Sequence, residues 1–235
     1  MKIIKNEKII KRNGTIGGWA MGIAFILMIG SLYVFYSGTT KTVTSVSYVT
    51  LAALAIGYIL MLIGSNLVKR YGGMPRVDEK IDSALKGLPG DYAIYHFSLP
   101  TQHLLVGPSG IWILLPYHQR GVMAYSKNRW QIKNGGFSQS YMSIFGLDGI
   151  GRPDLEAEDK IKSVKKHLAK ILNGIDIPEV RAALLLTNEQ MEIQAEGAPI
   201  PAIKLKQLKE FMRQKAKEKP ISTTQLAAIK SALPE

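Results

Sequence analysis

The chain has 235 residues, of which 46% are hydrophobic, and it contains no cysteine. It is long enough for one full domain and a smaller part, and disulfides, thiolate metal sites and cysteine nucleophiles are excluded. The formal net charge is +12, with much of the excess at the ends: residues 1–15 carry a net +4 and residues 203–235 a net +5. Such ends attract anionic lipid headgroups or nucleic acid, and composition does not choose between them.

Two apolar stretches without a charged residue follow the basic N-terminus. Ile16–Tyr36 has 21 residues and Val46–Val68 has 23, and about 20 residues suffice to cross a hydrocarbon core of about 30 Å. A signal peptide is the alternative for the first stretch, but that stretch is too long for one and no small-residue cleavage pattern follows it. We therefore expect a transmembrane hairpin over residues 16–68, with the lipid bilayer as a partner.

The distribution of lysine and arginine predicts the orientation of this hairpin. Five basic residues precede the first stretch, and Lys69, Arg70 and Arg76 follow the second, whereas Lys41 is the single basic residue between them. Basic residues are retained on the cytoplasmic side. The expected localisation is the cell membrane, as a multi-pass protein with both termini in the cytoplasm.

Small residues in both stretches predict close helix packing. Gly18 and Gly22 form a small-xxx-small pair, with Gly14 and Gly30 roughly in register, and Ala53 and Gly57 form a second pair. Such patches let two backbones approach each other. We expect the two spans to pack on each other through them; the alternative is that glycine is simply common in membrane helices.

After a linker at residues 69–76, the pattern changes to that of a mixed α/β domain at 77–220 with a helical extension at 221–235. Apolar residues at helical spacing predict helices over Val77–Leu88, Arg152–Leu172 and Leu205–Lys217, and a capping box at Ser222–Gln225 begins a helix through Leu233. Short apolar or alternating runs predict strands over Tyr92–Leu99, His103–Val106, Ile111–Leu115, Gly121–Tyr125, Arg129–Lys133, Val180–Thr187 and Met191–Gln194. A proline-containing loop then leads to Ile200–Ile203. Asn134–Gly151 is expected to be an irregular loop.

The centre of this domain is predicted to be a strand hairpin with Gly107-Pro108-Ser109-Gly110 as its turn, of type I or II. The second run, Ile111–Leu115, is apolar throughout, which is typical of a central strand buried on both faces. Together with the helices this order predicts a mixed sheet flanked by helices.

Several segments resemble the nuclease-related domain, or NERD, of the restriction-endonuclease-like superfamily. The similarity covers about residues 77–217 and is carried by LKGLPGDYAIYHFSLP, HLLVGPSGIWILL, Gly121, Trp130, the Pro153–Leu172 helix and the closing AALLLTNEQ and LKQLKEFMR. The resemblance implies a restriction-endonuclease-like fold and, where the chemistry is intact, metal-dependent cleavage of nucleic acid.

The catalytic positions that this resemblance implies are altered. Family members place an aspartate directly before the histidine of the first hairpin strand and a Glu-x-Lys on the second, where the carboxylates hold a divalent metal and the lysine assists the attacking water. Here these positions are Gln102, Leu115 and Tyr117, and Ile111–Gln119 contains no Asp, Glu or Lys. We therefore expect the fold without the nuclease chemistry, with no catalytic residue, no bound cofactor and Mg²⁺ only if a rearranged site operates.

Two acidic residues remain at positions that the family uses. Glu79 lies on the first helix, where the family often has a glutamate, and Glu156 lies where a glutamine commonly follows the proline of the later helix. A glutamate on an exposed helical turn is ordinarily a solvated surface residue. Neither is expected to assemble a metal site without the central carboxylates.

The histidines are the other candidate ligands: His96, His103, His118 and His167. His103 and His118 near the hairpin, with Gln102, would make an incomplete ligand set, because zinc sites use three or four ligands. The favoured interpretation is that His103 is packed between strand and helix and that His118 lies at an exposed strand end.

Three functions follow in order of preference. The first is a non-catalytic interaction or scaffold module at the cytoplasmic membrane face, with a protein partner that the sequence does not name. The second is a membrane-tethered, metal-dependent nuclease with a rearranged site. The third is nucleic-acid binding without cleavage. The basic helix at Lys204–Lys219 is interpreted as packed on the sheet with its lysines in water, with anionic lipid and then nucleic acid as the alternatives.

Overall fold

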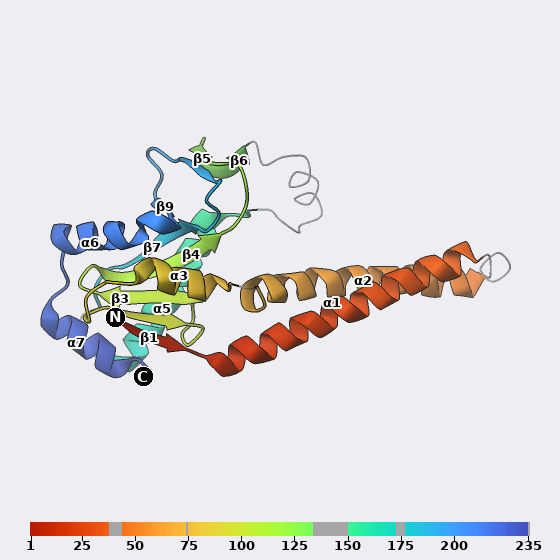
Figure 1. Cartoon of the computed structure of the whole chain (residues 1–235), viewed down its shortest axis with the longest axis horizontal. Helices are drawn as coiled ribbons and strands as arrows, with labels where there is room; N and C mark the ends of the chain where they lie inside the picture. Colours follow the sequence, from red (N-terminus) through yellow and green to blue (C-terminus); the bar gives the residue numbers. More distant parts are fainter. Residues whose placement is uncertain (38–43, 74, 134–149, 173–176, 235) are drawn as a thin grey trace. The chain divides into compact units, whose positions relative to one another are not determined.

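The computed structural model describes residues 1–37, 44–73, 75–133, 150–172 and 177–234, which form two compact units. The helical unit comprises Glu7–Arg76, and the α/β unit comprises Met1–Asn6 together with Val77–Glu235. Figure 1 shows the chain from its red N-terminus to its blue C-terminus. Lys41, between the two predicted spans, and most of the predicted Asn134–Gly151 loop lie outside the described residues.

The helical unit consists of two long apolar helices, α1 (Glu7–Tyr36) and α2 (Thr44–Tyr71). Each is long and apolar enough to cross a membrane. The expected pair of long apolar helices is therefore confirmed. The first helix begins at Glu7, well before the apolar stretch that starts at Ile16, so that its first turns are basic.

The two helices pack through small residues, but in a different register from the one predicted. A Cβ atom at Gly17 would lie 2.7 Å from Cβ of Leu67, and one at Gly64 would lie 2.9 Å from the backbone nitrogen of Met21. By contrast, a Cβ at Gly18, Gly22 or Gly30 would meet nothing within 4 Å. The expectation for Gly18 and Gly22 is therefore wrong.

The reason lies in the helix period. The buried stripe of α1 includes Ile10, Gly17, Ala24 and Ser31, which recur every seven residues, the spacing of two helices packed at a shallow angle. Successive residues of a helix are about 100° apart. Gly18 and Gly22 consequently belong to another face, whereas Gly57 does meet Met28 and Ala24 of α1, as expected.

The α/β unit is built on a six-stranded mixed sheet with the order β1-β2-β3-β4-β7-β9. Its strands are β1 (Lys2–Lys5), β2 (Ala93–His96), β3 (His103–Gly107), β4 (Gly110–Tyr117), β7 (Val180–Leu186) and β9 (Ala202–Lys204). Strands β2, β3 and β4 pair antiparallel, whereas β1 pairs parallel with β2, and β7 pairs parallel with β4 and β9. The predicted mixed α/β architecture is confirmed at this level.

A second, three-stranded sheet contains β6 (Arg129–Lys133), β5 (Val122–Ser126) and β8 (Glu192–Gln194), in that order. The turn between β5 and β6 places Lys127 and Asn128 at φ of 52° and 57°. Two such residues are typical of a type I′ hairpin turn.

Helices cover both faces of the main sheet. One apolar core joins α3 (Val77–Leu85) and α6 (Leu208–Glu218) to residues such as Leu105 and Leu114. The other joins α5 (Pro153–Ile171) and α7 (Thr223–Ala232) to the alternate residues, such as Leu104 and Ile113. In Figure 1, α3 and α6 are seen on the near side of the sheet and α5 behind it.

The C-terminal segments differ in detail from the predictions. The basic helix begins with a 3₁₀ turn, η1 (Leu205–Gln207), before α6. The last helix is α7, and its Leu226 and Ile229 are buried in the core, so that it forms part of the packed unit. Ser222 precedes α7, but its hydroxyl pairs with Thr224 Oγ1 at 2.6 Å and makes no cap hydrogen bond.

Of the two turn types predicted for the central hairpin, the backbone excludes type II and is compatible with type I. Among the described residues other than glycine, φ is positive at Phe97, Lys127 and Asn128 alone, so Ser109 does not have the positive φ that position three of a type II turn requires. Gly110 follows with φ of +100°. This left-handed residue closes the hairpin and accounts for the second glycine of the turn.

Candidate functional site

The carboxyl end of β4 holds the two positions at which the resemblance implied glutamate and lysine. Leu115 and Tyr117 are 5% and 6% exposed and contribute to the core on the α5 side of the sheet. The Tyr117 hydroxyl donates a hydrogen bond of 3.0 Å to Glu156 Oε2. Burial raises the pKa of Tyr117, and the neighbouring Glu156 carboxylate raises it further. The phenol therefore remains protonated at neutral pH and serves as a donor.

The other positions of that motif are not brought together. Gln102 is partly buried directly before β3, and its backbone carbonyl accepts a 2.8 Å hydrogen bond from the Phe97 amide. Glu79 lies on α3 and Glu156 on α5, helices that cover opposite faces of the sheet. The two remaining acidic residues thus lie on helices that cover opposite faces of the sheet, and the Leu115 side chain supplies no ligand atom between them.

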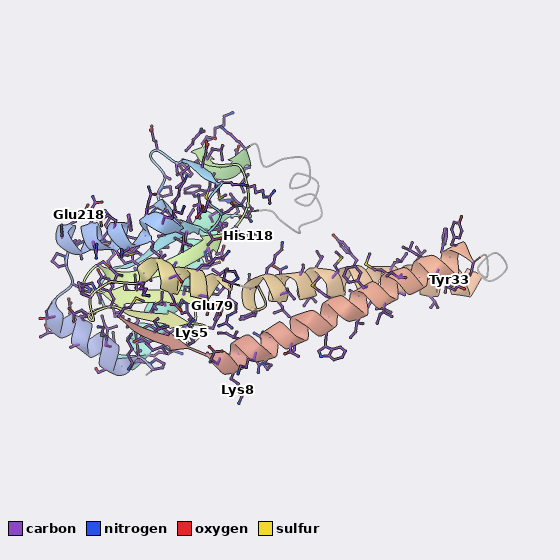
Figure 2. All side chains as sticks on the ribbon, in the orientation of Figure 1. Lys5, Lys8, Tyr33, Glu79, His118 and Glu218 are labelled. Atoms are coloured by element: carbon purple, nitrogen blue, oxygen red, sulfur yellow. The ribbon has the colours of Figure 1, made fainter. Side chains whose placement is uncertain are left out.

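A buried polar cluster lies instead on the α3 side of the sheet, all within the α/β unit. It consists of Lys5 from β1, Asp78 and Asp82 from α3, His96 at the end of β2 and His103 at the start of β3. Lys5 Nζ is 3.0 Å from Asp78 Oδ2 and 2.6 Å from Asp82 Oδ2. Figure 2 labels Lys5 on β1 and Glu79 on the adjacent helix.

Two histidines complete this cluster. His96 Nε2 is 2.9 Å from Asp82 Oδ1, and His96 Nδ1 is 2.7 Å from His103 Nδ1. The His96 and His103 side chains are fully or almost fully buried. Since one of two facing nitrogens must donate and the other accept, the chain Asp82–His96–His103 has a fixed hydrogen-bond direction once the proton on His96 Nδ1 is assigned.

Local backbone geometry positions these histidines. Phe97 has φ of +57°, which is uncommon for a residue with a side chain. This turn ends β2 at His96, earlier than predicted, and the Phe97 ring packs edge-on against His103 at a centroid distance of 5.2 Å. The strained residue therefore lies between the two histidines in sequence and supports the pair from one side.

The electrostatics of the cluster favour a charged Asp82 and a charged Lys5 beside a neutral His103. Burial lowers the pKa of Lys5, but hydrogen bonds and charges from Asp82 and Asp78 outweigh it and raise the net pKa. Burial raises the pKa of Asp82, but His96 and Lys5 outweigh burial and lower it overall. Burial, followed by the charge of His96, lowers the pKa of His103 to about 3.

The cluster is a positioning network, because its members are already bonded to one another. Asp82 accepts from both Lys5 and His96, and the two histidines face each other through their Nδ1 atoms. Within the described part of the chain, no group of three or more His, Asp or Glu side chains is placed to hold a metal ion. The arrangement stabilises the join between β1, α3 and the sheet.

Sequence reasoning anticipated part of this arrangement. His103 is packed between strand and helix and His118 is exposed at a strand end, both as interpreted, and the ring that faces His103 is that of His96. Lys5, Asp78 and Asp82 were missed as site residues. The position of Asp78 could have indicated this cluster, because an acidic residue on the buried face of α3, beside Ile81 and Leu85, needs a buried partner.

Comparisons of the chain with protein-family models, with curated proteins and with solved structures return no match. The resemblance to the nuclease-related domain therefore rests on the sequence motifs and on the element order of the α/β unit.

Proposed function

We propose that this chain is a two-span membrane protein that presents a NERD-like α/β domain on the cytoplasmic face, where it acts as a non-catalytic interaction module. The element order α3-β2-β3-β4-α5-β7 supports a restriction-endonuclease-like core, because it gives a helix, three antiparallel strands, a helix and a strand parallel to β4. Its partner is a protein at the membrane surface.

The membrane hairpin is supported by the position of β1. Strand β1 precedes α1, strand β2 follows α2, and the two strands pair in one sheet. A segment that leaves a compact unit and returns to it must begin and end on the same side of a bilayer. Two spans satisfy this condition, and the surplus of basic residues outside them favours the cytoplasmic side.

The observation that carries the non-catalytic assignment is the chemistry at the end of β4. Leu115 lies buried where a metal-binding carboxylate is needed, and Tyr117 donates to Glu156 where a lysine is needed. A leucine side chain provides no ligand atom, and a phenol with a raised pKa provides no positive charge.

The test is a nuclease assay on the full-length protein in detergent, since the α/β unit includes Lys2–Lys5 and a fragment beginning at Val77 would lack β1. We expect no cleavage of DNA or RNA with Mg²⁺ or Mn²⁺. The control is Glu158→Ala, which lies on α5 together with Glu156. Metal-dependent cleavage that is lost in Glu79→Ala or Glu156→Ala but retained in this control would establish the nuclease function instead. DNA binding without cleavage, with an affinity that falls steeply as the salt concentration rises, would indicate that the protein tethers nucleic acid to the membrane.

A further inference from the structure

A hollow lies at the edge of the main sheet where three parallel strands end. Strands β4, β7 and β9 run in the same direction, so their carboxyl ends meet at one edge, which is the usual place for ligands in open α/β sheets. Two adjoining cavities of about 480 and 450 Å³ occur there and share Lys80, Thr187, Asn188 and Glu189 as lining residues. We call the pair the strand-end hollow.

The lining of the strand-end hollow is strongly basic. Lys80 comes from α3, Arg120 from the segment after β4, and Lys204 and Lys206 from the end of β9 and from η1. Glu189 is the one acidic residue that lines it among the described residues, and its carboxylate is 2.8 Å from Lys206 Nζ. With Glu189 engaged by Lys206, the lining still contains two further lysines, Lys80 and Lys204, together with Arg120.

Two of these cations are only partly exposed. Lys80 and Lys204 both have intermediate exposure, and within the described ranges neither forms an ion pair or a side-chain hydrogen bond. Partial burial of an ammonium group is costly unless a negative charge or hydrogen-bond acceptors compensate it. An anion in the hollow would supply that compensation.

The loop that divides the two cavities is held in a defined conformation. Thr187 donates from its amide to the Tyr117 carbonyl at 2.8 Å, and Asn188 Nδ2 donates to the His118 carbonyl at 3.3 Å. The Asn188 side-chain oxygen in turn accepts from the Gln190 amide at 3.1 Å. Pre-organised polar walls lower the entropic cost of binding a small ligand. His118, labelled in Figure 2, marks the β4 side of the hollow.

We propose that the strand-end hollow binds a small organic molecule that carries a phosphate group. The phosphate would lie among Lys80, Arg120 and Lys204, and the organic part would contact Leu205, which lines the second cavity. Cavities of several hundred cubic ångströms are the size of sites for metabolites. A phosphate of this kind occurs on free metabolites and on lipid headgroups.

None of the positions that the nuclease resemblance implies is among the residues that line the strand-end hollow. Leu115 and Tyr117 belong to the core on the α5 side, whereas the helical residues that line the hollow come from α3 and η1, on the α6 side. The proposal therefore stands whether or not the domain is catalytic, and it does not depend on the membrane topology.

The experiment is isothermal titration of the full-length protein in a neutral detergent with two probes. ADP represents a free phosphorylated metabolite, and dihexanoyl phosphatidic acid below its micelle concentration represents a lipid headgroup. We expect at least one probe to bind, and binding to weaken about tenfold or more in Lys80→Ala/Lys204→Ala, because charge-assisted hydrogen bonds to phosphate are lost. Inorganic phosphate should compete with the probe.

The matched control is Lys162→Ala/Lys165→Ala, which removes two exposed lysines of α5 that do not line the hollow. Binding of ADP alone identifies a metabolite site, and binding of the lipid analogue alone identifies a headgroup site. The proposal is overturned if neither probe binds at millimolar concentration, or if the control weakens binding as much as the Lys80/Lys204 variant does. Equal thermal unfolding midpoints of the two variants ensure that lost binding reflects the hollow.

Discussion

Gly107 at the end of β3 is required by the approach of an aromatic ring. A Cβ atom at this position would lie 2.2 Å from Cδ1 of Tyr92, and the Tyr92 hydroxyl is held at the other end by the Met212 carbonyl at 3.3 Å. Since the ring is fully buried, it has no free space into which to move. Gly107 was predicted as a residue of the hairpin turn, and it is also needed because the Tyr92 ring packs against it.

We predict that Gly107→Ala lowers the free energy of unfolding of the α/β unit by about 2 kcal/mol or more, the scale of overpacking in a filled core. Thermal or denaturant unfolding followed by tryptophan fluorescence measures this. The control is Gly90→Ala, where a Cβ would meet nothing within 4 Å. Equal stabilities of the two variants would contradict the close approach.

His103 makes stability depend on pH over a defined window. Burial lowers its folded-state pKa from 6.5 to about 3, so that the unfolded chain takes up a proton near pH 6.5 while the folded state does not. The contribution of His103 to the free energy of unfolding is therefore fully present above pH 6.5. It decreases as pH falls toward 3, by about 1.4 kcal/mol per pH unit for one proton. The pKa of Asp82 is lowered from 3.8, so the stabilisation that its charged form provides is lost only at lower pH.

The expected outcome is that His103→Gln reduces the slope of unfolding free energy against pH between pH 6 and 4.5. The partly exposed His167 of α5 provides the control, because His167→Gln keeps the steep slope. Parallel slopes for His103→Gln and the unsubstituted protein would show that His103 does not stay neutral in the folded state.

Strand β1 is held to the sheet by a short ladder and by one ion-pair network. Lys5 Nζ lies within 3.0 Å of both Asp78 and Asp82, and Asp78 is only 1% exposed. Removing one partner of a buried pair costs about 3–5 kcal/mol, because the other charge remains desolvated. The cluster therefore fixes the edge strand β1 to α3.

We predict that Lys5→Met accelerates amide hydrogen exchange in residues 1–6 by about tenfold or more, since opening of β1 exposes backbone groups that now pair with β2. Exchange followed by mass spectrometry of the full-length protein measures this. The control is Lys5→Arg, which keeps a positive charge beside Asp78 and Asp82 and should change the rate much less. Unaltered exchange in Lys5→Met would mean that the ladder alone holds β1.

The register of α1 against α2 gives a matched pair of glycine substitutions. Gly64→Val places a side chain where the backbone of Met21 lies 2.9 Å from the Cβ position, whereas Gly18→Val places one in open space. We expect the first change to lower the thermal stability of the helical unit in detergent and the second to be tolerated. Greater sensitivity at Gly18 would show that this face packs against something else.

The sequence predicted elements with strong local signals and missed those that depend on distant partners. The helical period identified α3 and α5, and turn chemistry identified the β3–β4 hairpin. Strand β1 was not predicted, because four residues carry little periodicity and its partner β2 lies about ninety residues away. The Gly18 and Gly22 motif was assigned to the wrong face, since composition alone does not say which of several glycine stripes a neighbouring helix will meet.

In the candidate site, too, local features could be predicted and features that depend on distant residues could not. The sequence could predict that Leu115 and Tyr117 replace catalytic groups, because side-chain chemistry is local. It could not predict the buried polar cluster, whose five members, Lys5, Asp78, Asp82, His96 and His103, come from four different elements. Only the folded sheet brings these residues within hydrogen-bond distance.

At the scale of the whole molecule, the absence of cysteine from the sequence makes topology measurable with single introduced thiols. In intact cells, a membrane-impermeant maleimide should label Thr40→Cys, between the two spans. It should reach Lys8→Cys and Lys127→Cys only after the membrane is permeabilised. Labelling of Lys127→Cys in intact cells would contradict a cytoplasmic domain, and opposite results for Lys8 and Lys127 would contradict two spans.

The discontinuous α/β unit also constrains the order of events during synthesis. The ribosome produces β1 first, then both apolar helices, and only afterwards its partner β2. At about 5–20 residues per second, β1 waits roughly 5 to 20 s for that partner. If α1 and α2 insert into a membrane as proposed, both are available for insertion before β2 exists, so the sheet can be completed only after the two helices have been synthesised.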